Sequence, residues 1–178
     1  MLLTSANIAE PSPIKAKSGL TGIFKRPQTA PVMITAQGLA GDAIIDRANH
    51  GSPEQAVYLY GQLDYDWWEV ELGQPLPSGT FGENLTIAGI SSADMCIGDQ
   101  IEIGPVLLEL TWPRIPCVTL AARMADTGFV RRFHRAQRPG AYARVLRSGA
   151  VQAGMAVQHR RISRDALPLL SHFPKIGP

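Results

Sequence analysis

The sequence has few cysteines and no long apolar run. Its 178 residues include only two cysteines, Cys96 and Cys117, which are too few for a disulfide framework and indicate a reducing compartment. Charges or glycines break every apolar run well before the roughly 20 residues that a transmembrane helix needs. The N-terminus also lacks the basic start and long apolar stretch of a secretory signal. We therefore expect a soluble, cytoplasmic protein with no membrane partner, folded as a single domain over residues 1–178.

Basic residues are scarce in the first two thirds of the chain and acidic residues in the last third. Residues 1–120 hold 6 Lys or Arg and 13 Asp or Glu, a net charge of −7. Residues 121–178 hold 11 Lys or Arg and 2 Asp or Glu, a net charge of +9. The segment RRFHRAQR (131–138) is rich in arginine, whose planar fork suits phosphate, so it suggests an anionic ligand. Nucleic acid is disfavoured, because few aromatic residues are interleaved and no recognition motif is present. A solvated basic face is the plain alternative.

Glycine and proline interrupt the chain at short intervals, and β-branched or aromatic runs fall between them. Such spacing predicts a mainly β fold, a barrel or a sandwich, with a few peripheral α-helices. The predicted strands cover residues 20–24, 31–36, 56–60, 84–87, 100–104, 106–112, 141–147 and 150–159. Hydrophobic periodicity predicts a helix over 62–73, which Gly73 and Pro75 should end. Further helices are expected over 117–124, just after Pro116, over 126–136 and, as a short terminal helix, over 165–172.

The stretch TWPRIPC (111–117) contains the Cys117 thiol in a segment of restricted backbone conformation. Pro113 and Pro116 fix their own φ angles and favour extended conformations before them. Arg114 lies three residues before Cys117, and the predicted helix places the thiol at a helix N-terminus; both features favour the thiolate. A thiolate is the form that attacks electrophiles or binds soft metals. The alternative is that Cys117 is a small core residue, as most cysteines outside disulfides are.

Two glycine-containing turns carry further polar residues. His50 lies on the turn His50-Gly51-Ser52-Pro53, where an imidazole is more accessible than in a core, and Glu83 and Asn84 follow Gly82 at a strand entry. Hydrogen bonds that only tie these turns together are the alternative in both places. Cys96 is expected to be structural, because nothing basic or metal-binding surrounds it. The spacing of cysteines and histidines does not favour a closed zinc site.

Taken together, these motifs resemble the MOSC domain, named after the C-terminal part of molybdenum-cofactor sulfurases. The resemblance is to the small stand-alone bacterial branch and covers about residues 20–158, which leaves 160–178 as a short tail or helix. It rests on five segments in the family's order: GIFKRP (22–27), GLAGDAIIDRANHGSPEQAVYLY (38–60), FGENLTI (81–87), CIGDQIEIG (96–104) and PRIPC (113–117). Ser52 and Glu54 depart from the glycine and aspartate that usually follow the family's histidine turn.

The resemblance implies a MOSC-type β-barrel that binds molybdenum cofactor (molybdopterin). Cys117 matches the family's cysteine, a molybdenum ligand in the relatives that reduce N-hydroxylated compounds. Arg114, Asn84 and Glu83 match further motif residues, and Lys25 lies where the family often has a basic residue. We assign Lys25, Arg47, Asn84 and Arg114 to cofactor binding, and His50 and Glu83 to proton transfer beside Cys117.

Two functions are compatible with this resemblance. The first is reduction of hydroxylaminopurine or amidoxime substrates by a Cys117-ligated molybdenum. It needs an external electron-donor protein, because the chain has no cysteine set for an iron–sulfur cluster. The second is a non-enzymatic carrier of molybdenum cofactor, or of persulfide sulfur on Cys117. The motifs are the same for both, so only turnover separates them.

Overall fold

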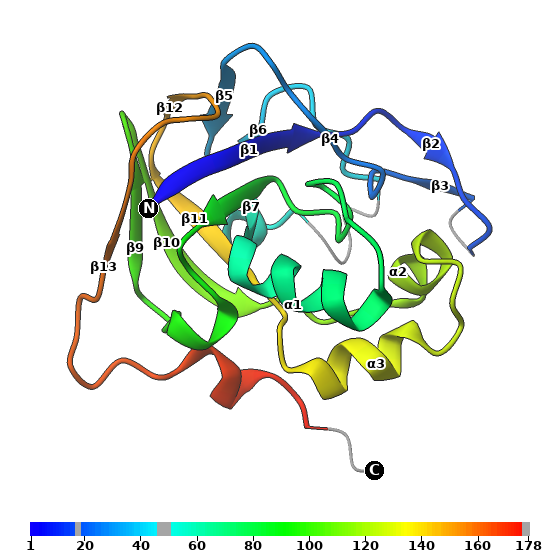
Figure 1. Cartoon of the computed structure of the whole chain (residues 1–178). Helices are drawn as coiled ribbons and strands as arrows, with labels where there is room; N and C mark the ends of the chain where they lie inside the picture. The colour runs from blue at the N-terminus through cyan, green and yellow to red at the C-terminus, as the bar shows by residue number, and fades with distance from the viewer. Residues whose placement is uncertain (17–18, 46–50, 176–178) are drawn as a thin grey trace.

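The computed structural model describes residues 1–16, 19–45 and 51–175 and shows strands arranged around a central core, with helices packed on one side (Figure 1). The strands are β1 Leu2–Ile8, β2 Ser12–Pro13, β3 Leu20–Thr21, β4 Arg26–Pro27, β5 Val32–Thr35, β6 Gly38–Leu39, β7 Val57–Gly61, β8 Leu85–Ala88, β9 Gln100–Ile103, β10 Val106–Pro113, β11 Ala141–Arg147, β12 Gly149–Val151 and β13 Val157–Arg160. The helices are α1 Gln62–Leu72, α2 Val118–Arg123 and α3 Phe129–Ala136, with 3₁₀ turns η1 Pro53–Gln55, η2 Ser92–Asp94 and η3 Leu169–His172.

Eight strands form one sheet in the order β13-β9-β10-β11-β7-β8-β1-β4, and β7 and β8 are its parallel pair. The start of β1 also meets the segment before β13: Leu2 and Ala156 form an isolated bridge, and the Leu3 amide donates to the Met155 carbonyl at 2.9 Å. This contact is one bridge and not a strand ladder. Among the described residues the mainly β fold with few helices is therefore confirmed, whereas a closed barrel is not found.

The sheet encloses the main apolar core. Along β10, Val106, Leu108 and Leu110 are buried while Leu107 and Glu109 are less so, as expected for side chains that alternate between the faces of a strand. These residues pack with apolar side chains from β1, β5, β7, β8, β9 and β11. The resulting core fixes the strand ends from which the polar residues described below project.

A second, aromatic core lies beneath the helices. It includes Trp68 of α1, Phe129 and Phe133 of α3, and Phe81, all at most 1% exposed. The rings of Trp68 and Phe133 stack with their centres 5.8 Å apart. Helix α1 ends at Gly73, as predicted; its φ of 66° is the left-handed conformation that glycine adopts without strain. This core attaches α1 and α3 to the sheet.

Most of the predicted elements are present, with shorter bounds. The helix predicted over 126–136 begins at Phe129, the terminal helix is the 3₁₀ turn η3, and the strand predicted over 150–159 is divided between β12 and β13. Strand β1 was not predicted and lies between β8 and β4 in the sheet. Within the described ranges, no helix is both long and apolar enough to cross a membrane.

Candidate functional site

A cavity of about 790 Å³ opens beside the N-terminus of α2, within the size range of small-molecule sites. Its walls come from distant parts of the chain: the segments 20–25 and 42–45, strand β7, the turn before β8, the loop after β10, and strand β11. Its polar side chains include Lys25, Asp42, Tyr58, Asn84, Arg114, Cys117 and Tyr142. Four predicted site residues, Lys25, Asn84, Arg114 and Cys117, therefore meet in one place.

Cys117 is the residue at which the extended loop becomes a helix. It has extended backbone angles, φ −131° and ψ 173°, and its carbonyl accepts the Leu120 amide at 3.0 Å. The helix predicted from this residue is α2, so the predicted position of the thiol at a helix N-terminus is confirmed. The side chain is partly exposed and lines the cavity, which distinguishes it from the buried Cys96.

Arg114 is buried without an opposing carboxylate among the described residues. It is 6% exposed, its guanidinium carbon lies 5.5 Å from the centre of the Tyr58 ring and 5.7 Å from that of Phe133, and its Nη1 has no hydrogen-bond partner. Burial lowers its pKa, but Tyr58, Tyr142 and Cys117 together raise the pKa above its ordinary value. A buried cation with a donor left over is suited to an anionic group in the cavity.

Lys25, Asp42 and Asn84 form a buried polar group on another wall. The Lys25 ammonium donates to both carboxylate oxygens of Asp42, at 2.6 and 2.5 Å, and the Asn84 amide donates to Oδ2 at 2.8 Å. Asp42 Oδ1 also accepts the backbone amide of Ala9 at 2.9 Å. Burial lowers the pKa of Lys25, although Asp42 opposes that shift. Because Asp42 already balances the charge of Lys25, Arg114 is the better partner for a ligand anion.

Glu83 lies behind the cavity and not on its wall. Its side chain is fully buried, and Oε1 accepts hydrogen bonds from the Tyr65 hydroxyl at 2.7 Å, the Gly79 amide at 2.6 Å and the Thr86 hydroxyl at 2.8 Å. Burial raises the pKa of this carboxyl, while those hydrogen bonds oppose the shift. These hydrogen bonds hold Oε1 in place, whereas Oε2 is buried without a hydrogen-bond partner, and the assignment of Glu83 to proton transfer stays a prediction.

The remaining predicted residues, His50 and Arg47, lie outside the described residues. The described chain on either side, Ile45 and Gly51, lines the cavity. The predicted roles of His50 in proton transfer and of Arg47 in cofactor binding therefore remain predictions.

Among the cavity residues that were not selected from the sequence are Asp42, Tyr58 and Tyr142. Burial raises the pKa of the Tyr142 phenol and Arg114 lowers it, while Cys117 raises it further, so these three side chains lie close together. The alternation of β11 places Tyr142 on the opposite face from the buried Ala141 and Ala143. That alternation is visible in the sequence, but the cavity on that side is not.

The outer part of the cavity is apolar. Its lining includes Leu20, Ile45, Ile115 and Val118, and these side chains are 45%, 38%, 47% and 69% exposed. The polar residues lie deeper, since Arg114 and the side chains of Lys25 and Asp42 are all less than 10% exposed. The cavity therefore combines a charged inner end with an apolar entrance.

The residues fit a metal only if another group supplies most of its ligands. In the described chain, no cluster of three or more His, Cys, Asp or Glu side chains could hold a metal ion. A pterin dithiolene would bring two sulfur ligands of its own, and the Cys117 thiolate is a soft protein group that would fit beside them. The unpartnered Arg114 Nη1 beside it fits the anionic character of such a cofactor.

Several known proteins are similar to this chain in sequence or in fold. YflK of Bacillus subtilis (strain 168) is 37% identical over 152 residues, which cover 84% of this chain and 69% of YflK. A protein named reductase from Gibberella moniliformis is 35% identical over 139 residues, 75% of this chain but 24% of that much longer protein. The crystal structure of YiiM from Geobacillus stearothermophilus superposes with a TM-score of 0.78 at 27% identity, covering 95% of this chain and 80% of YiiM. The sequence model described as "MOSC domain" matches residues 46–158, and the chain therefore belongs to the MOSC domain family.

Proposed function

We propose that this protein binds molybdenum cofactor in the cavity, with Cys117 as the protein ligand to molybdenum, and reduces N-hydroxylated compounds such as hydroxylaminopurines or amidoximes. The observation that carries the proposal is the pairing of a cavity thiol with a buried arginine that lacks a carboxylate partner among the described residues. Membership of the MOSC family and the relative named reductase support it.

In this proposal the protein holds the cofactor and orients it, and the cofactor, when bound, supplies the two-electron chemistry at its metal. Cys117 anchors the metal from the N-terminus of α2. Arg114 donates to an anionic group of the cofactor, and its cation stabilises the neighbouring thiolate. Asp42 holds Lys25 and Asn84 in place, and all three residues line the cavity.

The reduction also requires protons, and Tyr142 is the described side chain best placed to hold one. Its hydroxyl lies in the cavity near Arg114 and Cys117, and its raised pKa keeps the phenol protonated. An amidoxime takes up two electrons and two protons, its N–O bond breaks, and water leaves. A phenol near the departing hydroxyl is suited to donate one of these protons.

The test is metal and pterin analysis of three proteins expressed in parallel in a molybdenum-supplemented, cofactor-competent host: wild type, Cys117→Ser and Cys96→Ala. Cys96 is the matched control, because it is buried outside the cavity. We expect stoichiometric molybdenum in wild type and in Cys96→Ala, and loss of molybdenum in Cys117→Ser. Loaded wild type should then reduce benzamidoxime with reduced methyl viologen.

Other outcomes have distinct meanings. Molybdenum that binds without reduction of any N-hydroxylated compound would favour the cofactor carrier. Negligible metal in all three proteins would contradict cofactor binding, and an added sulfur atom on Cys117 in the mass spectrum would then favour the persulfide carrier.

A further inference from the structure

Helix α3 carries basic residues that the cavity does not use. The segment RRFHRAQR, in which the sequence suggested an anionic ligand, contains most of α3, and none of its residues lines the cavity. Phe129 and Phe133 face inward and are at most 1% exposed, whereas Arg131 and Arg135 are exposed. The arginines are one turn apart and therefore lie on the same outer side of the helix.

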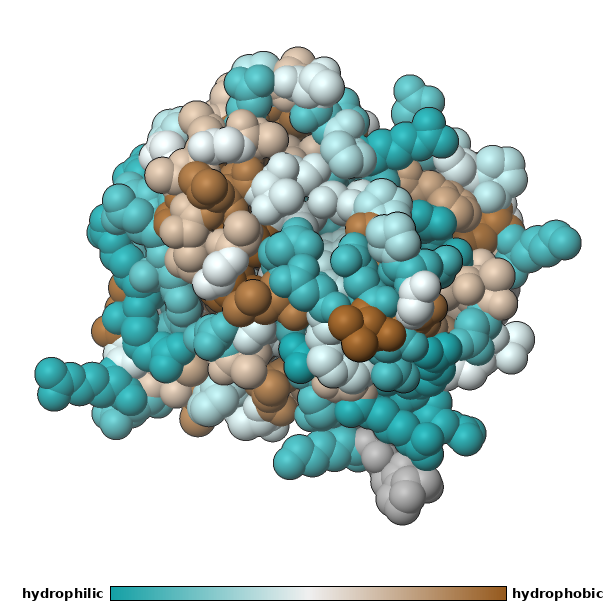
Figure 2. Space-filling model, viewed as in Figure 1, coloured by the Kyte–Doolittle hydropathy of each residue, from teal (hydrophilic) through white to brown (hydrophobic). Residues whose placement is uncertain are grey.

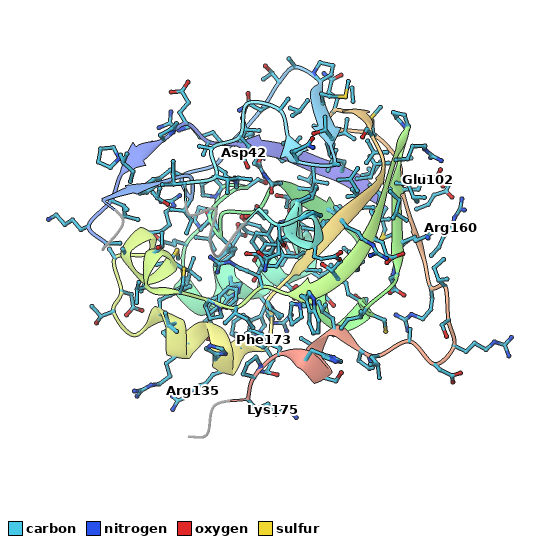
Figure 3. The ribbon with its side chains drawn as sticks, turned by 180° about the vertical axis from the view of Figure 1, so that it is seen from behind. Asp42, Glu102, Arg135, Arg160, Phe173 and Lys175 are labelled. Carbon is cyan, nitrogen blue, oxygen red and sulfur yellow. The ribbon has the colours of Figure 1, made fainter. Side chains whose placement is uncertain are left out.

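The cations on this side are not balanced by the protein itself. Among the described residues, Arg132 pairs with Asp126 and Glu71, but no ion pair involves Arg131, Arg135 or Lys175. Figure 3 shows Arg135 and Lys175 near each other and directed outward, at the α3 end of the molecule. We call Arg131, Arg135 and Lys175 the basic face. In Figure 2, hydrophilic side chains cover the lower right of the molecule, where α3 runs in Figure 1.

The helix dipole accounts for only one of the two exposed arginines. Arg135 lies in the last turn of α3, where a cation is favourable with the helix dipole. Arg131 lies in the first turn, which has no acidic residue, and a cation there is unfavourable; the two arginines also repel each other by a few tenths of a kcal/mol. The local structure therefore offers no stabilising role for Arg131.

The inner side of α3 contacts Arg114, a residue of the proposed site. The Phe133 ring lies 5.7 Å from the guanidinium carbon of Arg114, and Arg114 in turn lies close enough to Cys117 for their charges to interact. One helix, about 10 Å in diameter, thus separates the basic face from a side chain of the cavity wall. A protein docked on the outer side of α3 would lie behind a residue of the cavity wall, on a helix that does not itself line the cavity.

We propose that the basic face docks an acidic, one-electron carrier protein of the flavodoxin type that reduces the site. This inference rests on the proposed function, which requires electrons from outside the chain. Two carrier molecules give one electron each per substrate, and two protons come from the solvent; together these balance the two electrons and two protons consumed when the N–O bond breaks and water forms. A few complementary charges suffice, because electron-transfer encounters use small interfaces and depend on electrostatic steering.

Nucleic acid fits this side of the molecule less well. Binding of single strands relies on exposed aromatic rings on which bases stack, and the aromatic residues of α3 are buried. Small anions fit less well too, because Arg131 and Arg135 project from a helix surface and do not converge in the cavity.

The experiment compares two double charge reversals, Arg131→Glu/Arg135→Glu and Arg160→Glu/Arg164→Glu. The second pair is the matched control: it changes the net charge equally, and Figure 3 shows Arg160 on the other side of the molecule from Arg135. Each protein is tested for binding to purified flavodoxin at about 20 mM and about 300 mM ionic strength. Each is also tested for benzamidoxime reduction with photoreduced flavodoxin and, separately, with reduced methyl viologen.

At low ionic strength we expect the affinity of the α3 variant for flavodoxin, and its rate of reduction with photoreduced flavodoxin, to fall about tenfold. The same two quantities should stay within about twofold of wild type in the control. High salt should weaken the wild-type interaction, and the viologen-driven rate should be the same in all three proteins. Equal losses in both variants, no loss in either, or no binding by wild type would overturn the docking face. Tighter binding of a single-stranded oligonucleotide that is lost in the α3 variant would also overturn it. Absence of viologen-driven reduction would instead refute the proposed function, and flavodoxin binding would still decide the docking face.

Discussion

The guanidinium carbon of Arg114 lies 5.5 Å from the centre of the Tyr58 ring, in a position where a buried arginine would ordinarily face a carboxylate. An aromatic face is a weaker partner for a cation than an ion pair with full hydrogen bonding. Arg114 therefore remains able to bind an anionic ligand through its guanidinium group.

Replacing Arg114 with methionine should separate stability from binding. Arg114→Met removes a buried charge with an unpartnered Nη1 and keeps most of the apolar volume, so we expect the free energy of unfolding of the cofactor-free protein to stay level or rise by about 1 kcal/mol. Bound pterin and molybdenum should fall to background. Urea titration and metal analysis measure the two effects, with Arg164→Met, an exposed arginine, as the control. Strong destabilisation of the cofactor-free variant would mean that Arg114 is structural.

Removing the carboxylate of Asp42 should destabilise the fold through Lys25. Their side chains are 5% and 9% exposed, so Asp42→Asn leaves a buried ammonium without its counter-charge and should cost about 3 kcal/mol. Lys25→Met in the same chain should recover part of this loss. A double-mutant cycle by urea unfolding measures the coupling. Additive effects of the two substitutions would contradict a buried, interacting pair.

Glu83 should make stability depend on pH. Burial raises its pKa above the ordinary 4.5, so as pH rises the unfolded chain releases the proton first. The stabilisation due to Glu83 is then complete below pH 4.5 and is lost as pH passes through the folded-state pKa. As the pH rises from 4.5 to neutrality, we expect the free energy of unfolding to fall less in Glu83→Gln than in wild type. Asp64, whose pKa burial also raises, is present in both proteins and cancels in the difference. Parallel stability curves would show that Glu83 does not titrate in this range.

The apolar entrance should select substrates with an apolar body. Val118 is 69% exposed at the cavity, so Val118→Asp should raise the KM for benzamidoxime about tenfold, with molybdenum content and kcat little changed. Val70 on α1 is 84% exposed and does not line the cavity, which makes Val70→Asp the control. Steady-state kinetics with hydroxyurea as a small polar substrate completes the comparison, and an equal KM rise for both substrates would refute selection by the entrance.

Local patterns in the sequence were sufficient for the elements that present Cys117. The position just after Pro116 predicted the helix that begins at Val118, and the β-branched and aromatic run over 106–112 predicted β10 before it. Strand β1 was missed because its buried positions include Ser5 and Asn7, which read as polar interruptions. Both are satisfied by hydrogen bonds, from Ser5 to Asn7 at 2.5 Å and from Asn7 to Thr86 at 3.3 Å, and no local rule foresees the second of these.

The cavity was only partly predictable for the same reason. Asp42 contacts Ala9, Lys25 and Asn84, which are 33, 17 and 42 residues away. Contacts between residues so far apart in the sequence form only because the strands pair in a particular way, and the spacing of residues along one segment does not predict them. The family resemblance brought Lys25 and Asn84 into one list, but it left out the aspartate that holds them.

The bridge between Leu2 and Ala156 bears on the order in which the molecule is completed. Strand β1 pairs with β8 and also meets the segment before β13, although Leu2 and Ala156 lie far apart in the sequence. Pairings between such distant segments form slowly. The Ala9 amide, which follows β1 and donates to Asp42, therefore takes its place in the cavity wall only once β1 has paired. A ligand that fills this cavity meets a complete set of walls only in a chain whose distant strands have already paired.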